Sequence, residues 1–376
     1  MKREAFKVPG IINLSGNVLN RKTNCLQEEI APERRLEHID IEITKKCNLF
    51  CLHCSARSDS PGRELSLKEI KIILDNASSL GMKNVGFTGG EPLVRRNKLF
   101  ALLKYCKHTL NSKTHLHTNG TLLKSKDAAM MTRLVDRITV TLFGSKPETH
   151  DGVTSVKGSL KAAEEGLRKL VRQSANVRTF VVPMKPNYRE IPQILKKVHE
   201  IGCRKIRILT LSPTGRARIH FENLSLDSND VKWLNGELIK ARNELDIDID
   251  AGFCTQQYYS GLGILEGHQS CLAAENRVHI DAFGEVFPCT ASSGLQLFSA
   301  GNLRKCAFNL SDIWKFSPVF QFIRFFHSNP PNKCRGCAIY QRCMGGCRVM
   351  MHYKYGDITA AKSNCNTPKL FPAQLS

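Results

Sequence analysis

Short apolar stretches of period two alternate along the chain with longer segments of helical period. The first stretch, at 38–44, carries isoleucine at every second position and is typical of a strand. A capping box of Ser66 and Glu69 then precedes apolar residues at helical spacing over 70–77. Five further strands are predicted at 84–88, 114–118, 137–143, 177–182 and 205–210. This alternation predicts an α/β fold, in which a parallel sheet curls into a partial (β/α)6 TIM-type barrel.

Polar residues and tight turns follow the ends of these strands. Cys47 follows the first strand, Glu91 the second, Asn119 the third, Gly144 the fourth and Asn187 the fifth. In parallel sheets of this kind, ligands bind at the carboxyl ends of the strands. The pattern therefore predicts one functional site at that edge of the sheet.

The pattern also divides the chain into parts. Residues 1–36 are polar and weakly patterned, and predict an N-terminal extension ahead of the barrel at 37–225. A bridge at 226–270 contains a predicted helix and a short strand. Residues 271–376 open with a predicted hairpin that turns at Gly284, and indicate a small cysteine-rich α+β domain.

Composition narrows the class of protein. The 376 residues include 15 cysteines and carry a formal net charge of +21. No apolar run is long enough for a membrane span or a secretory signal, so we expect a cytoplasmic protein that does not bind membrane. Cysteines in a reducing cytosol indicate metal ligation rather than disulfides. The basic residues are scattered without a nucleic-acid motif, so they either cover a solvated surface or meet an acidic substrate or leader peptide.

Three cysteines share the short loop after the first strand. Cys47, Cys51 and Cys54 have the spacing C-x3-C-x2-C. Three thiolates in one loop can bind one [4Fe–4S] cube and leave its fourth iron open to a small chelating molecule. Structural thiols or half of a zinc site are the alternatives, although zinc sites usually pair two C-x2-C units.

The turn after the second strand contains Gly89, Gly90 and Glu91. Glycines let the backbone approach a ligand closely, and a carboxylate accepts from an ammonium group; an ordinary turn is the alternative. The cysteine triplet and this turn together resemble the radical S-adenosylmethionine (radical SAM) superfamily. The resemblance implies that the three cysteines hold the cluster and that SAM binds its open iron. It also implies that the glycine backbone and Glu91 receive the methionyl amine of SAM.

The resemblance implies further contacts. His53 matches the residue that packs on adenine, and a plain surface histidine is the alternative. Thr118, Asn119 and Thr141 match positions that contact the ribose or the carboxylate, although polar residues often end strands. Arg216, after the sixth strand, is a candidate for binding a substrate carboxylate or is simply solvated.

Cysteines gather again from residue 271 in the pattern C-x12-G-x4-C, gap, C-x2-C-x5-C-x3-C, gap, C. This pattern resembles the SPASM extension of radical SAM enzymes, which implies two auxiliary [4Fe–4S] clusters. A zinc ribbon would use the middle four cysteines and leave the other three unexplained. For the first cluster the resemblance implies Cys271, Cys289 and Cys347, with Cys254 or an open iron in fourth place; for the second it implies Cys334, Cys337, Cys343 and Cys365.

The resemblance implies reductive cleavage of SAM to a 5′-deoxyadenosyl radical that abstracts a substrate hydrogen. The reaction that the resemblance implies uses three [4Fe–4S] clusters and an electron donor such as flavodoxin or ferredoxin. We expect oxidative modification of a ribosomally made peptide. Because 1–36 is too short for a leader-binding domain, recognition of the leader needs either a separate leader-binding protein or the enzyme's own surface. The alternative is oxidation or rearrangement of a small molecule such as a sugar, an aminocyclitol or a tetrapyrrole. A plain electron carrier would leave the triplet and the glycine turn without a purpose, and Thr290 replaces the aspartate base of the sulfatase-maturing branch.

Overall fold

The computed structural model describes residues 34–251, 271–337 and 340–361. From Arg35 on, the described residues belong to one compact unit. Within them, no helix combines the length and the apolar character that a membrane span needs. Ten strands form one sheet: β1 (His38–Glu42), β2 (Asn84–Thr88), β3 (Lys113–Thr118), β4 (Arg137–Thr141), β5 (Val177–Val181), β6 (Lys205–Ile208), β7 (Asp248–Ala251), β8 (Arg277–Ile280), β9 (Glu285–Phe287) and β10 (Gly301–Asn302).

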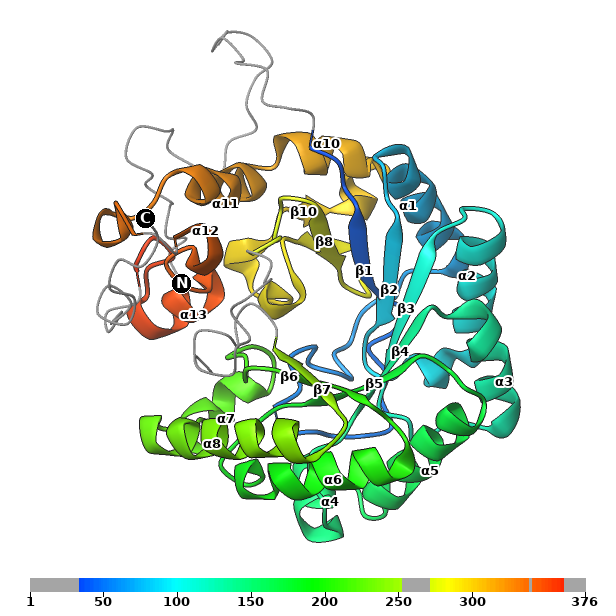
Figure 1. Cartoon of the computed structure of the whole chain (residues 1–376). Helices are drawn as coiled ribbons and strands as arrows, with labels where there is room; N and C mark the ends of the chain where they lie inside the picture. The colour runs from blue at the N-terminus through cyan, green and yellow to red at the C-terminus, as the bar shows by residue number, and fades with distance from the viewer. Residues whose placement is uncertain (1–33, 252–270, 338–339, 362–376) are drawn as a thin grey trace, which may run out of the picture. The chain divides into compact units, whose positions relative to one another are not determined.

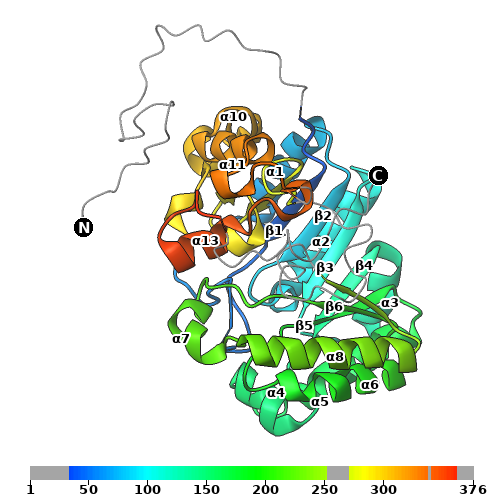
Figure 2. The ribbon, with the colours of Figure 1, turned by 60° about the vertical axis from the view of Figure 1, so that its left-hand side comes forward.

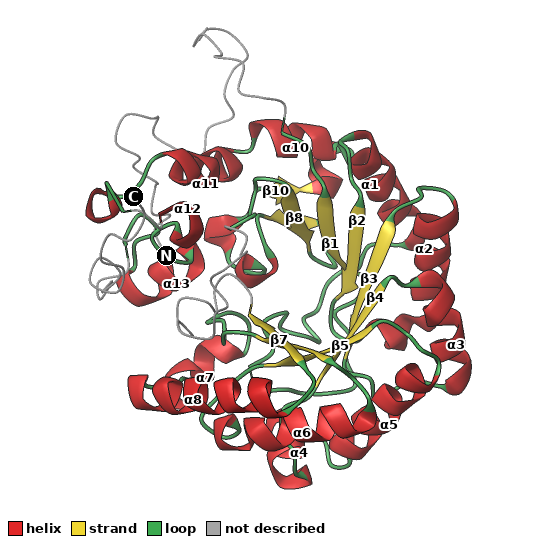
Figure 3. Ribbon diagram, in the orientation of Figure 1, coloured by secondary structure: helices red, strands yellow, loops and turns green. Residues whose placement is uncertain are grey.

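The strand order is β10-β9-β8-β1-β2-β3-β4-β5-β6-β7. Strands β1 to β8 run parallel to their neighbours among themselves, and β9 and β10 continue the sheet antiparallel. The sheet is curled, and helices cover its outer face (Figures 1 and 3). This arrangement confirms the predicted α/β fold with a partial TIM-type barrel.

Helices alternate with the strands as the apolar spacing predicts. The capping box of Ser66 and Glu69 begins the first one, with Glu69 N donating to Ser66 Oγ over 3.2 Å and Ser66 N donating to Glu69 Oε2 over 2.7 Å. Helices α10, α11 and α13 lie together on the β8 side of the sheet (Figure 2). The helices are α1 (Leu67–Ser79), α2 (Arg96–His108), α3 (Ser125–Leu134), α4 (Pro147–Thr154), α5 (Ser159–Arg172), α6 (Ile191–Ile201), α7 (Ala217–Leu224), α8 (Ser228–Glu244), α10 (Leu310–Phe316), α11 (Pro318–Ser328), α12 (Tyr340–Cys343) and α13 (Arg348–Tyr355).

The two faces of the barrel sheet differ in polarity. Ile39 and Ile41 of β1 point to the helices and are fully buried. On the concave face, the rings of His38 and His115 stack 5.8 Å apart although β2 lies between their strands. Gly86 of β2 leaves the space for this, because an added Cβ there would lie 2.1 Å from Asp40 Oδ1. The inner face of the barrel is therefore polar, and the outer face supplies the apolar core.

The sheet extends further than the sequence pattern predicts. The hairpin β8–β9 and its turn at Gly284 are confirmed. However, β8 also pairs in parallel with β1, so that Arg277 lies opposite His38. Strand β7, predicted only as part of a bridge, pairs with β6. A period-two pattern identifies the two faces of a strand but not its neighbours, because backbone pairing leaves no signature in the side chains.

Arg304 ties the chain after β10 to the start of α1. Its Nε and Nη2 donate to the Glu69 carboxylate over 2.8 and 3.0 Å, and the same guanidinium donates to the carbonyls of Arg63 and Glu64. The bond from Arg304, against the opposing effect of burial, lowers the pKa of Glu69 to about 2. Glu69 therefore takes part both in the N-terminal cap of α1 and in the ion pair with Arg304.

Replacing Arg304 by glutamine is expected to lower the free energy of unfolding by about 1–2 kcal/mol, because a charged bidentate hydrogen bond is lost. The loss is no larger because solvent partly screens this ion pair. Arg63→Gln is the matched control, since Arg63 is 82% exposed and lies 3.6 Å from the same carboxylate. That variant should lose no more than about 0.5 kcal/mol. Urea denaturation at pH 7 measures both, and equal losses would contradict a special role for Arg304.

Candidate functional site

The three cysteines of the loop after β1 lie close together at the carboxyl end of the barrel. All three are free and half-buried. Burial raises the pKa of Cys47 to about 11, and burial with the neighbouring Cys54 and Cys47 raises that of Cys51 to about 12. Thiols that raise one another's pKa are unstable as thiolates by themselves and become stable when a cationic group binds them.

Polar hydrogens point at these sulfur atoms. Leu49 N donates to Cys47 Sγ over 3.4 Å, and Ser58 N donates to Cys54 Sγ over 3.5 Å. The Asn119 amide lies 3.9 Å from Cys47 Sγ. Hydrogen bonds to sulfur are typical of iron–sulfur sites. The described residues contain no group of three side chains that converges on a single metal ion. Three neighbouring thiols with N–H groups directed at two of their sulfur atoms are a donor set that fits an iron–sulfur cluster.

Arg216 braces the cysteine loop from the segment after β6. Its Nε donates to Cys51 O over 3.1 Å, while Nη1 and Nη2 donate to Ser58 O and Oγ. Gly215 (φ +59°) makes the approach possible, because a Cβ there would lie 2.2 Å from Cys54 O. Arg216 therefore has a structural part that the sequence did not indicate, and its binding of substrate stays a prediction.

The glycine turn packs directly on the backbone that leads into the loop. Gly90 N donates to Thr44 O, and Glu91 N donates to Lys46 O, each over 2.8 Å. An added Cβ at Gly89 or at Gly90 would lie 2.3 Å from a carbonyl oxygen of this segment. The two glycines are thus required by the backbone contact itself, and their role toward SAM stays a prediction.

Glu91 fixes the end of β3 beside the loop. It is fully buried, and its carboxylate accepts from Thr118 Oγ1 over 2.8 Å and from Asn119 N over 2.7 Å. The Asn119 side chain in turn donates to Asn48 Oδ1 over 3.0 Å. The structure therefore brings together Glu91, Thr118 and Asn119, as the sequence analysis expects, and leaves their contacts with SAM as predictions.

His53 and Thr141 lie at the same end of the barrel. His53 is in edge-to-face contact with Phe143, with ring centres 4.4 Å apart, and its Nδ1 is buried without a hydrogen-bond partner. Burial, followed by the nearby Arg216, lowers the pKa of His53 to about 4, so the ring is neutral at pH 7. A neutral aromatic ring suits the predicted contact with adenine. Thr141 is half-buried where β4 ends.

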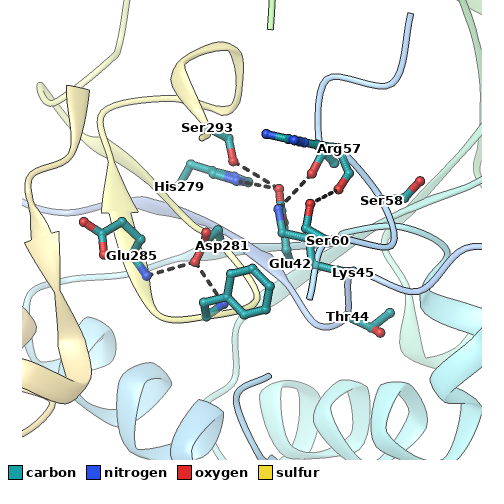
Figure 4. Close-up of polar contacts among 12 residues, drawn as sticks. Glu42, Thr44, Lys45, Arg57, Ser58, Ser60, His279, Asp281, Glu285 and Ser293 are labelled. Carbon is teal, nitrogen blue, oxygen red and sulfur yellow. Dashed lines mark hydrogen bonds and ion pairs between the residues drawn. The ribbon is translucent and has the colours of Figure 1, made fainter. Parts of the chain in front are cut away.

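A buried ionic network, which sequence reasoning missed, lies between the loop and the hairpin (Figure 4). The Glu42 carboxylate is hydrogen-bonded to His279 Nε2 and to Ser293 Oγ, each over 3.2 Å, and pairs with Lys45 Nζ at 2.5 Å. Lys45 Nζ also donates to Ala56 O in the loop. Burial opposes the charge on Glu42, but Lys45 and His279 outweigh it and hold the pKa at about 2. The only sequence signal was a charged residue inside an apolar strand.

Three of the later cysteines line one pocket. Cys271, Cys289 and Cys347 come from before β8, after β9 and before α13, and meet in a recess closed by Phe298 and Phe326. Burial and the neighbouring Cys289 thiol raise the pKa of Cys271 to about 12. This trio is the one assigned by resemblance to the first auxiliary cluster. Cys254, its candidate fourth ligand, lies outside the described residues.

Cys334, Cys337 and Cys343 form a second group around Tyr340. Cys337 N donates to Cys334 O over 3.2 Å, and Cys334 and Cys343 both act on the pKa of Tyr340, which burial raises. Cys365, the fourth member of the predicted set, lies outside the described residues. The described part of the second group is therefore compact, and its completion stays a prediction.

Replacing Arg216 by glutamine is expected to speed the loss of iron from the cysteine loop. Residues that orient metal ligands typically contribute about 10–100-fold to metal affinity. Iron release to an excess of chelator, followed anaerobically, measures the effect. Arg218→Gln removes the same charge from an exposed position two residues later and serves as control. Equal release rates for the two variants would contradict the bracing role.

Comparison with known proteins identifies relatives along most of the chain. The AdoMet-dependent heme synthase of Methanosarcina barkeri is 27% identical over 346 residues, which cover 86% of this chain and 94% of that protein. The PqqA peptide cyclase of Granulibacter bethesdensis is 24% identical over 332 residues, with coverage of 86% and 85%. Among solved structures, Streptococcus suis SuiB bound to the precursor peptide SuiA has a TM-score of 0.71 at 21% identity, with coverage of 88% of this chain and 76% of SuiB. This last likeness supports the fold.

Two family models match the chain itself. The model of the radical SAM superfamily matches residues 41–198, from β1 into α6. The model of the iron–sulfur cluster-binding domain SPASM matches residues 271–338, which include the hairpin and the first cysteines of the second group. The chain therefore belongs to the radical SAM superfamily, as an enzyme with a C-terminal SPASM domain.

Proposed function

We propose that this enzyme cleaves SAM reductively and uses the resulting radical to oxidise a ribosomally made peptide. The observation that carries the proposal is the meeting of Cys47, Cys51 and Cys54 at the carboxyl end of the barrel, with N–H groups directed at the sulfur atoms of Cys47 and Cys54. SAM at the open iron supplies, on one-electron reduction, a 5′-deoxyadenosyl radical that abstracts a substrate hydrogen. Flavodoxin or ferredoxin is the proposed electron donor.

The chain's own residues bind and orient SAM in this proposal. Asn119 is held at the cluster loop by Asn48, and Glu91 holds Asn119 and Thr118 in place. Such pre-formed contacts position the target C–H bond and exclude water from the radical. The proposed SAM contacts are His53, Gly89, Gly90, Glu91, Thr118, Asn119 and Thr141.

The SPASM domain contributes two auxiliary [4Fe–4S] clusters in the same proposal, which gives three in all. Cys271, Cys289 and Cys347 bind the first, with Cys254 as its fourth ligand, and the pocket that the three described cysteines line supports this. Cys334, Cys337, Cys343 and Cys365 bind the second. When bound there, the auxiliary clusters would supply an acceptor for the electron that leaves the substrate radical. We assign 1–36 to an extension, 37–225 to the barrel, 226–270 to the bridge and 271–376 to the SPASM domain.

Two similarities support a peptide substrate. One relative is a peptide cyclase, and the fold is that of an enzyme solved with a precursor peptide. The net charge of +21 suits an acidic leader, which the chain binds by itself or through a separate leader-binding protein. A tetrapyrrole is the second candidate, because heme synthases are similar along 86% and 92% of this chain.

The triple variant Cys47→Ala, Cys51→Ala, Cys54→Ala tests the loop. Reconstituted protein should hold about twelve irons in three cubes, and the variant about four fewer, because one cube loses all its ligands. SAM cleavage should disappear. Cys106→Ala is the control, since Cys106 is buried in α2 away from the cysteine groups. SAM cleavage that persisted in the triple variant would contradict the assignment of these cysteines to the SAM-binding cluster.

The substrate class is tested by incubating reduced enzyme and SAM with the precursor peptide encoded nearby. A peptide substrate should lose the mass of two hydrogens, because one leaves to 5′-deoxyadenosine and one as a proton when the radical is oxidised. Mass spectrometry follows the peptide, and chromatography follows 5′-deoxyadenosine. If no peptide changes, with or without a partner protein, and a tetrapyrrole does, the second candidate replaces the first.

A further inference from the structure

In the part of the chain that the structure describes, the inner face of the barrel carries arginines on four strands. Three carboxylates are found to act on them. Of these carboxylates, Asp250 binds both Arg207 and Arg178, and Asp40 lies 3.9 Å from Arg277. The third, Asp248, is exposed and acts on Arg178. The arginines are Arg137 on β4, Arg178 on β5, Arg207 on β6 and Arg277 on β8.

Arg137 is the fourth arginine, and no described residue forms a hydrogen bond or an ion pair with its side chain. The residue is only half-buried, so solutes can reach it. Burial, followed by Arg178, Arg207 and Arg277, lowers the pKa of Arg137 to about 10. Arg277 lies four strands from Arg137 in the sheet, so its action on Arg137 is across the curled inner face. Asp250 opposes this repulsion in part, but its carboxylate already binds Arg207 and Arg178. A guanidinium close to three others is destabilising unless a further anion joins them.

Other polar atoms on this face also lack a hydrogen bond. Arg277 Nε is buried without one, since its ion-pair partner Asp40 Oδ2 lies 3.9 Å away, and His115 Nδ1 is likewise buried without one. Buried polar atoms of this kind are rare and require an explanation, which a bound ligand provides. His115 and His117 add no charge at pH 7, since burial lowers the pKa of His115 to about 3 and that of His117 to about 4.

These donors lie at the end of the barrel opposite the cysteine loop. Arg137 and Arg277 are the first residues of β4 and β8, whereas the loop follows the last residue of β1. A strand rises about 3.3 Å per residue, so five residues separate the two ends by about 15 Å. A substrate that spans the barrel would therefore have its anionic end about 15 Å from the carbon that reacts.

We propose that the inner face of the barrel, at Arg137 and Arg277, binds carboxylate groups of the substrate. The inference rests on the proposed function, because it takes the substrate of that reaction to reach from SAM into the barrel. It narrows the substrate to a molecule with carboxylates remote from the reacting carbon. An acidic peptide segment and a compact polycarboxylate share this chemistry. Arg–carboxylate bonds are bidentate and directional, so the donors spread over several strands suit several carboxylates rather than one compact phosphate.

The test measures binding of two probes to the reconstituted enzyme by anaerobic calorimetry. The probes are the tripeptide Glu-Glu-Glu and propane-1,2,3-tricarboxylate, with Gln-Gln-Gln and inorganic phosphate as comparisons. Arg137→Gln should weaken the binding of the carboxylate probes by about tenfold or more, since a charged bidentate pair between the guanidinium and a carboxylate is lost. Arg133→Gln removes the same charge from the exposed side of α3 and should change binding less than about twofold. Arg137→Lys should restore part of the affinity.

Each outcome decides the inference. Tighter binding of the tripeptide assigns the site to an acidic peptide, and tighter binding of the tricarboxylate assigns it to a small molecule. Equal losses in Arg137→Gln and Arg133→Gln, or tighter binding of phosphate, would overturn it. Without a probe, Arg137→Gln should raise the melting temperature, because repulsion among the arginines falls; a lower value would contradict the anion-site reading. SAM cleavage in the same samples reports separately on the proposed function.

Discussion

The backbone that leads into the cysteine loop lies against the Gly89–Gly90 turn at a distance that excludes any side chain. An added Cβ at either glycine would lie 2.3 Å from a carbonyl oxygen of this backbone. Two N–H···O bonds of 2.8 Å close the contact. Glu91, next in the chain, extends the constraint to the end of β3 through Asn119. The loop therefore starts from a backbone that is held in place, and this fixes where its cysteines begin.

The same region holds a buried charge network whose role is connection. Glu42 and Lys45 are almost fully buried, and a buried ion pair adds little net stability because both charges lose water. Breaking such a pair, however, leaves one charge uncompensated, which costs about 3–5 kcal/mol. The pair joins the cysteine loop, through Ala56, to the segment after Cys289, through Ser293. The network therefore connects two cysteine-bearing regions that are far apart in the chain.

The inner face of the barrel differs from this network because its charges do not balance. Glu42 pairs with Lys45 and is hydrogen-bonded to His279 and Ser293, whereas Arg137 is close to three other arginines and shares with two of them a single nearby carboxylate, Asp250. A protein that keeps like charges together gives up stability, which is common where a ligand must bind. The apolar residues on the outer face of the same strands, such as Ile39, carry the packing that supports this.

The sequence by itself determined most of the barrel's strands and helices and pointed to the chemistry. Period-two and helical patterns predicted β1 to β6, and the spacing of Cys47, Cys51 and Cys54 indicated a cluster loop, because such signals are local along the chain. Only the tertiary structure decided that β8 lies beside β1, that Cys271, Cys289 and Cys347 meet in one pocket, and that Arg216 braces the loop. The tertiary structure also brings four arginines that are far apart in the sequence to the inner face of the barrel. These facts depend on sheet order and curvature, which set the distance between residues far apart in sequence and leave no periodic trace in it.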